Sequence, residues 1–263
     1  MLYSLYISFT DWDFMSPDYR NVGLDNYQHI LETSVFYQAL RNTLFFAAGT
    51  VIPTIVLGLL LALLVHQKVK GAGFYRTILF SPWVTPMMAV SIVWSWIFEP
   101  RIGLANWLLK LLHLPPLEWT ASTTWALPAI MIVTVWKGAG WAMVFYLNAL
   151  QKVSKELYEA ASMDGASKWK RFISITMPLI SPTTFFLLIM IAVDSLQAYD
   201  QIQILTQGGP SNSTTTLLYM YYQYAFEQFN VGEATAVATI LVIITVLLSL
   251  VQFLFAKNWV HYQ

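Results

Sequence analysis

The stretch AVATILVIITVLLSLVQFLFA, Ala236–Ala256, contains no charged side chain. A helix of about 20 apolar residues is long enough to cross the hydrocarbon core of a bilayer, which is about 30 Å thick. Four other stretches of similar length and polarity occur, at residues 44–65, 78–98, 125–149 and 173–196. The sequence therefore predicts an all-α membrane protein, a polytopic helical bundle with five complete transmembrane helices.

The composition agrees with that class. Hydrophobic residues make up 57% of the 263 residues and charged residues only 11%, whereas soluble domains carry about 25% charged residues. We expect the whole chain, residues 1–263, to form a single transmembrane domain. The net charge of zero provides no basic face for nucleic acid. Cysteine is absent and the four histidines are scattered along the chain, so we expect no metal site.

A sixth apolar stretch, from Leu2 to Phe9, is too short to cross a membrane. Eight helical residues rise only about 12 Å. We expect this stretch to be the C-terminal end of a truncated first transmembrane helix.

The positions of lysine and arginine predict the orientation, because cytoplasmic connections carry an excess of both. Residues 66–76 and 150–172 are rich in these residues and should be cytoplasmic. The connections 10–41, 99–124 and 197–235 are acidic or balanced and should lie outside. The C-terminus, at Lys257 and beyond, is then cytoplasmic.

The second cytoplasmic connection leads into the most charged stretch of the chain, EAASMDGASKWKRFISITMP, which begins at Glu159. Ser154 is a plausible N-cap for a short helix over 155–163 that Gly165 closes, and Ser167 can cap a second short turn. Alanines on one side of the first helix favour close approach to another protein surface. The alternative is a solvated connection that only carries the positive-inside signal.

Two ionisable side chains lie inside predicted spans, and such residues are functional candidates by default. Lys137 lies in WKGAGW, next to glycines that could open the helix, and Asp194 lies in AVDSLQAYDQ. The two residues can form a structural ion pair or face a water-filled cavity, and both alternatives stay open. Prolines also lie within several spans, where they act either as ordinary kinks or beside a water-filled path.

A family resemblance enters at the charged stretch. Glu159-Ala160-Ala161 and Asp164-Gly165-Ala166, followed by Phe172, Ile175 and Pro178, resemble the EAA loop of permease subunits of bacterial ABC importers. Further stretches resemble the carbohydrate-uptake branch, whose members serve maltose-type oligosaccharides and glycerol-3-phosphate. These stretches are VGLDNY from Val22, SPWVTP from Ser81, GLANWLL from Gly103, TQGGPSNSTTT from Thr206, and the final WVHYQ.

The resemblance implies the permease fold of type I ABC importers and a transmembrane permease subunit of an ATP-driven carbohydrate importer, which is not itself an enzyme. In that family the EAA loop is a coupling helix that inserts into a cleft on the ATPase. The implied coupling residues are Leu157, Glu159, Ala160, Ala161, Asp164, Gly165 and Ala166. The implied substrate path, in which Trp141 and Tyr199 can stack on a sugar, consists of Lys137, Gly138, Trp141, Asp194, Ser195, Ala198 and Tyr199.

The resemblance also implies the partners. They are ATP-binding subunits that use ATP and Mg, a second and different permease subunit, an extracytoplasmic substrate-binding protein, membrane lipid and the carbohydrate itself. This chain is expected to bind no cofactor and to lie in the bacterial cell membrane. The outer segment that begins with TQGGP, which has a turn and then a tyrosine-rich helical part, resembles the surface that meets the binding protein, or else forms an interfacial belt.

Two other functions were weighed against this one. An ion-coupled secondary transporter of a small polar solute would show internal repeats and several intramembrane carboxylates. No clear repeat occurs here, and Asp194 is nearly alone. An intramembrane enzyme would need a catalytic motif such as His-Glu-x-x-His, and none occurs. The chain also has no G-x-x-x-x-G-K-[ST] loop, so a partner must hydrolyse ATP.

Overall fold

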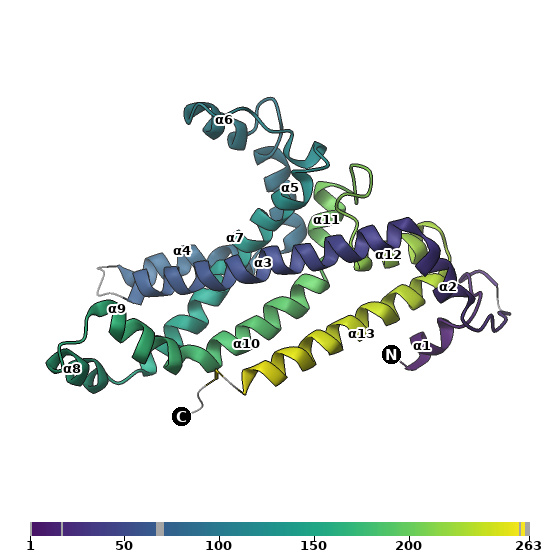
Figure 1. Ribbon diagram of the computed structural model, residues 1–263. Helices are drawn as coiled ribbons and strands as arrows, with labels where there is room; N and C mark the ends of the chain where they lie inside the picture. Colours follow the sequence, from purple (N-terminus) through teal and green to yellow (C-terminus); the bar gives the residue numbers. More distant parts are fainter. Residues whose placement is uncertain (1, 17, 67–70, 258, 261–263) are drawn as a thin grey trace. The chain divides into compact units, whose positions relative to one another are not determined.

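The computed structural model describes residues 2–16, 18–66, 71–257 and 259–260 (Figure 1). Regular structure in these parts is helical, apart from an isolated β-bridge between Thr10 and Asn21. The prediction of an all-helical membrane protein is therefore confirmed.

Four helices of the described residues are long and apolar enough to cross a membrane. They are α3 (Ser34–His66), α7 (Ala126–Lys152), α10 (Met177–Leu196) with the turns that lead into it from Lys168, and α13 (Val231–Ala256). A fifth span results if α4 (Ala72–Val84) and α5 (Met87–Ile97) are counted together. The structure thus has four to five candidate spans.

The predicted span 78–98 is not one continuous helix, because α4 and α5 are separated at Thr85 and Pro86. Helix α4 ends at Val84, and Thr85 has an extended backbone with φ −75° and ψ 134°. Pro86 explains this break, because a proline disfavours the helical conformation of the residue before it and has no N–H to donate. By contrast, α3 continues through Pro53 and α10 continues through Pro182.

Helix α3 begins well before the predicted span 44–65. Its first turns contain polar residues, and these bind the loop before α12 (Leu217–Tyr222). The Asn42 Nδ2 donates to the carbonyls of Asn212 and Thr215, each at 3.0 Å. The Thr43 Oγ1 accepts from the Leu217 N–H at 2.9 Å. The polar residues are satisfied in this way, so the helix extends into the predicted external loop 10–41.

The remaining elements are short, and they lie in the predicted connections or at the N-terminal end, except for one π-helical turn that lies mostly within the predicted span 173–196. They are α1 (Leu2–Ile7), α2 (Asp25–Glu32), α6 (Leu104–Leu111), η1 (Trp119–Ala121), α8 (Lys155–Met163), α9 (Lys168–Arg171), the π-helical turn η2 (Phe172–Thr176), α11 (Asp200–Leu205), α12, and the π-helical turn η3 (Gln223–Glu227). Helix α12 and turn η3 confirm that the tyrosine-rich part of the segment beginning with TQGGP is helical.

The chain divides into two compact units. The first comprises Met1–Gly49, Met87–Val133 and Val193–Leu248, and the second comprises Thr50–Pro86, Thr134–Ala192 and Ser249–Gln263. Helices α3, α7, α10 and α13 each contribute residues to both units.

The first unit has two hydrophobic clusters. One gathers residues of α5, α7, η1 and α11 around Phe98, Trp119 and Ile202. The other gathers residues of α2, α3, α12 and α13 around Ile30 and Val237. Burial of these apolar side chains holds the short helices α2, α11 and α12 against the longer helices of the unit.

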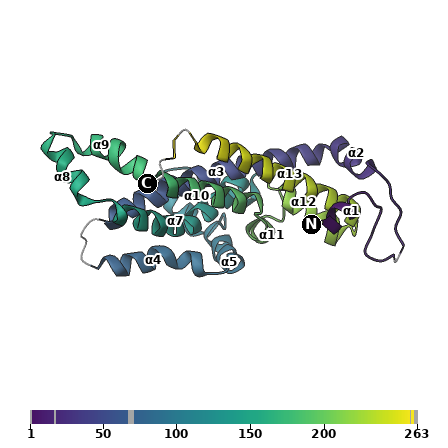
Figure 2. The same ribbon diagram turned by 90° about the horizontal axis from the view of Figure 1, so that it is seen from below.

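The second unit packs α3, α7 and α10 around one hydrophobic cluster, whose centre includes Met143, Tyr146 and Ile180. Helix α4 also belongs to this unit and packs closely on α7. A methyl group on Gly140 would overlap the backbone carbonyl of Leu79 in α4. Helices α8 and α9 form a short helical pair between the end of α7 and the start of α10, as both views show (Figures 1 and 2).

Candidate functional site

The first candidate site is the pair α8 and α9 with its caps, residues 154–172, which we call the knob. The helix Lys155–Met163 has the predicted bounds and the predicted N-cap. The Ser154 Oγ accepts from the Glu156 N–H at 3.2 Å, and the Ser167 Oγ accepts from the Lys170 N–H at 3.2 Å. Each serine satisfies one of the donors that a helix start leaves open, so residues within three positions set where the two helices begin.

The turn between the two helices is a Schellman motif. The Gly165 N–H donates to the Ser162 carbonyl at 3.1 Å, and the Ala166 N–H donates to the Ala161 carbonyl at 2.9 Å. Gly165 has φ +74°, which other residues adopt only with strain. A Cβ atom at Gly165 would meet nothing within 4 Å, so the backbone conformation, and not lack of space, requires the glycine.

The knob presents its side chains to the surroundings. Neither α8 nor α9 contains a buried residue. Leu157, Glu159, Ala160, Asp164 and Gly165 are exposed, and Ala161 and Ala166 are half-buried. All seven predicted coupling residues are therefore brought together on one small projection.

Two large apolar side chains of the knob escaped the sequence prediction. Met163 is 85% exposed and Trp169 is 68% exposed. Both side chains are therefore open to contact by a partner protein. They could have been recognised in the sequence as a methionine and a tryptophan within a strongly charged stretch.

A hydrogen bond joins α8 to the start of the next span. The hydroxyl groups of Tyr158 and Thr176 are 2.7 Å apart. Thr176 is only 4% exposed and ends the π-helical turn η2. The sequence does not predict this bond, because the two residues lie in different helical segments on either side of the Gly165 turn.

The second candidate site is a cluster of Trp83, Lys137 and Trp141, which we call the Lys137 cluster. The Lys137 Nζ donates to the Trp83 carbonyl at 2.9 Å and lies 4.8 Å from the centre of the Trp83 ring. The rings of Trp83 and Trp141 are stacked with centroids 5.0 Å apart. Trp83 is in the last turn of α4, where carbonyls have no helical N–H partner, so Lys137 satisfies one of them.

The predicted site does not include Trp83. Its stretch SPWVTP, with a tryptophan between two prolines, could have indicated a helix end with an aromatic side chain. Gly138 faces Thr54, and a Cβ there would be 3.1 Å from the Thr54 Cγ2. Helix α7 is unbroken through Gly138 and Gly140, so these glycines allow close helix packing and do not open the helix.

The remaining predicted path residues belong to the first unit, near the end of α10. Asp194 is exposed, Tyr199 is half-buried, and Ser195 and Ala198 are 3% and 4% exposed. The Tyr199 ring contacts the ring of Tyr222, with centroids 4.9 Å apart. Of these four residues, Asp194 and Tyr199 are therefore the ones whose side chains are exposed enough to contact a ligand.

Burial affects the tyrosines of this outer segment. Desolvation raises the pKa of Tyr199 well above its ordinary value, with a further contribution from Tyr222. Desolvation also raises the pKa of Tyr219 to about 12, helped by the negative charge of Glu227. Both phenols therefore stay neutral at physiological pH and can donate hydrogen bonds.

The seven predicted path residues fall into both units, so each group stands by itself. Lys137, Gly138 and Trp141 lie in the second unit, and Asp194, Ser195, Ala198 and Tyr199 lie in the first. Among the described residues, no group of three or more His, Cys, Asp or Glu side chains is placed to hold a metal ion.

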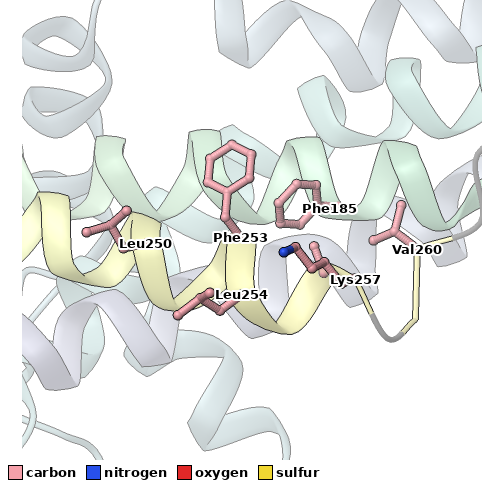
Figure 3. A pocket seen from close by; sticks show the side chains of 7 residues that line it. Phe185, Leu250, Phe253, Leu254, Lys257 and Val260 are labelled. Carbon is pink, nitrogen blue, oxygen red and sulfur yellow. The ribbon is translucent and has the colours of Figure 1, made fainter.

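An apolar groove of about 530 Å³ lies in the second unit between α10 and the end of α13. Figure 3 shows the rings of Phe185 and Phe253 beside Leu250, Leu254 and the charged Lys257. A carbohydrate site needs several hydrogen-bonding side chains, and this lining offers a single ammonium group. The groove is therefore unsuited to a sugar.

The chain matches known proteins along most of its length. The family model described as "Binding-protein-dependent transport system inner membrane component" matches residues 54–260. The probable ABC transporter permease protein YurN of Bacillus subtilis (strain 168) is 33% identical over 259 residues, covering 97% of this chain and 89% of that protein. The diacetylchitobiose uptake system permease protein NgcF of Streptomyces coelicolor is 34% identical over 264 residues, covering 95% of this chain and 75% of that protein.

A solved structure supports the same fold. A bacterial ABC transporter involved in the import of the acidic polysaccharide alginate contains a chain with a TM-score of 0.83 at 22% sequence identity. The match covers 97% of this chain and 88% of that chain. This chain belongs to the family of binding-protein-dependent transport system inner membrane components, and it is a multi-pass inner membrane permease subunit of an ABC importer, a transport component and not an enzyme.

Proposed function

We propose that this permease carries a carbohydrate, adopts the type I importer architecture over residues 1–263, and receives the energy of ATP hydrolysis through the knob. The exposed, doubly capped knob is the observation that carries the coupling proposal. The carbohydrate proposal is supported by the 34% identity to a diacetylchitobiose uptake permease and by the stacked tryptophans of the Lys137 cluster.

The knob docks into a cleft of a separate ATP-binding subunit, which uses ATP and Mg. Leu157, Ala160 and Ala161 supply a narrow apolar face, and Glu159 supplies a charge for a basic partner residue. Met163 and Trp169 extend this face, because large apolar side chains act as anchors when a partner buries them.

The bond between Tyr158 and Thr176 then carries the movement of α8 into α10. π-Helical turns occur mostly as single-turn bulges inside α-helices and are frequent at functional sites. We place the joint of this movement at η2, because the hydroxyl pair at its end connects it to the knob.

The substrate-path proposal covers two groups of side chains, one in each unit, and each group is tested by itself. Trp141 and Tyr199 are proposed to stack on the apolar face of a sugar ring with the ring face turned away from Trp83 and Tyr219, respectively. Lys137 and Asp194 offer charged hydrogen-bonding groups to hydroxyls. Gly138, Ser195 and Ala198 belong to the same path and allow close packing around it.

The other partners follow from the orientation predicted by the basic residues. The connections 66–76 and 150–172 and the C-terminus face the cytoplasm and the ATPase. The outer connections 10–41, 99–124 and 197–235 face the extracytoplasmic substrate-binding protein. A second, different permease subunit completes the path in the bacterial cell membrane.

The coupling proposal is tested with Glu159→Lys in the assembled transporter in proteoliposomes. We expect uptake and substrate-stimulated ATP hydrolysis to fall together by about tenfold or more, the effect of losing one buried charge pair. Glu159→Asp, which keeps the negative charge at the same position, serves as the control and should retain both. Normal uptake with Glu159→Lys would refute the coupling role.

The substrate proposal is tested with a panel of labelled sugars and glycerol-3-phosphate. We expect one carbohydrate to be taken up in an ATP-dependent manner, and Trp141→Ala and Asp194→Asn to lower its uptake. ATP-dependent uptake of glycerol-3-phosphate alone would overturn the carbohydrate assignment. Unchanged affinity and rate in both variants would overturn the path.

A further inference from the structure

Helix α6, Leu104–Leu111, is held in one rotational position by Asn106. This side chain is 1% exposed. Its Nδ2 donates to the carbonyls of Pro100 and Leu117, each at 2.8 Å. Its Oδ1 accepts from the Leu117 N–H at 3.0 Å and from the Trp119 Nε1 at 2.9 Å. Four hydrogen bonds therefore orient the helix within its connection.

This orientation leaves an apolar stripe on the outside of the helix. Leu104, Trp107, Leu108 and Leu111 follow the spacing i, i+3, i+4 and i+7, and they are 51%, 54%, 47% and 57% exposed. On the opposite side, Ala105 and Leu109 pack against the core around Trp119. A helix at a water-facing surface has the reverse arrangement, with its polar side outward.

The exposed stripe lies next to the end of a membrane helix. Helix α5 is half of the broken candidate span, and it exposes Met88, Val93 and Trp96 to 52%, 52% and 71%. Between the two helices, Ile102 is 89% exposed. Apolar exposure therefore continues from α5 into α6, which follows it directly in the fold (Figure 1).

We propose that α6 lies in the membrane–water interface, with Leu104, Trp107, Leu108 and Leu111 in the acyl region of the lipid. Leucine and tryptophan on one face, with a lysine outside that face, are typical of helices that lie in this plane. Lys110 is exposed and remains among the headgroups. The lipid surface is favoured over a protein partner because the stripe continues the apolar surface of α5.

The role of α6 goes beyond the proposed transport function. An interfacial helix holds the end of α5 at a constant depth in the membrane. Helix α5 packs extensively against α11, which directly follows Tyr199. Helix α6 thus anchors the part of the first unit that carries Tyr199.

The absence of cysteine makes a direct test possible. Leu108→Cys and Leu111→Cys are each spin-labelled in the transporter assembled in nanodiscs of phosphatidylethanolamine and phosphatidylglycerol. The matched control is Lys110→Cys, on the same helix but outside the stripe. Relaxation by oxygen, which concentrates in lipid, is compared with relaxation by a water-soluble nickel chelate.

We expect labels at 108 and 111 to favour oxygen over nickel by about threefold or more relative to the label at 110, as burial in the acyl region requires. Equal nickel accessibility at all three positions would overturn the proposal. Protection of 108 and 111 from both reagents would also overturn it, in favour of a covering protein. Sugar uptake by the same samples reports separately on the proposed function.

Discussion

The knob and the Lys137 cluster are built by different kinds of contact. The capping bonds of the knob join residues two or three positions apart, such as Ser154 with Glu156 and Ser167 with Lys170. The central bond of the Lys137 cluster joins residues 54 positions apart. The knob therefore depends on local backbone conformation, whereas the Lys137 cluster depends on how two helices pack.

The two regions also differ in exposure. The knob buries no residue of α8 or α9, so changes there should alter function more than folding. The Lys137 cluster is half-buried next to a broken helix, so changes there should alter both. The following predictions test this difference, beginning with the largest expected effect.

Gly140→Val should disrupt the packing that supports the Lys137 cluster. The added side chain would overlap the Leu79 carbonyl, and two backbones cannot separate without loss of neighbouring contacts. Overpacking of this kind costs about 3 kcal/mol or more when backbone must move. We expect the yield of monodisperse protein and its unfolding temperature to fall sharply. The control is Gly73→Val, where a Cβ meets nothing within 4 Å; equal behaviour of the two variants would contradict the prediction.

Lys137→Met should leave the Trp83 carbonyl without this donor at the end of α4. A hydrogen bond to a charged group contributes about 1.5–3 kcal/mol, so we expect lower thermal stability together with reduced uptake. Lys152→Met, at the exposed end of the same helix, should change little. If the two variants have the same stability, the bond has no structural role.

Gly165→Val should impair coupling while the protein still folds. A β-branched residue in the left-handed conformation is strained by about 1–2 kcal/mol, and the turn between α8 and α9 would shift. We expect lower uptake per ATP hydrolysed with normal yield. Gly165→Asn is the matched comparison, because asparagine tolerates this conformation. Equal coupling in the valine and asparagine variants would show that the turn does not matter.

Tyr158→Phe should have the smallest effect. It removes the hydroxyl that bonds Thr176 and keeps the ring, which costs about 0.5–1.5 kcal/mol. We expect a modest decrease in uptake per ATP, and no further decrease in the double variant with Thr176→Val. Additive effects of the two substitutions would mean that the residues act independently.

The knob was predicted from the sequence almost residue by residue. Ser154, Gly165 and Ser167 act on backbone groups within three positions, so their residue types alone indicate caps and a turn. The break at Pro86 was not singled out, because the sequence contains prolines in several spans. Which proline breaks a helix depends on neighbouring groups that are distant in sequence, such as Lys137 on the Trp83 carbonyl.

Hydrophobic run lengths, cap residues and the EAA pattern by themselves determined that this is a helical permease with two short capped helices over residues 154–172, for which we propose the coupling role. Those features act over one helix turn or along one uninterrupted run. Only the tertiary structure decided that Trp83 stacks on Trp141, that Tyr158 bonds Thr176, and that Asn106 turns an apolar stripe outward. Each of these contacts joins residues of different elements, so folding has to bring them together before their chemistry can be seen.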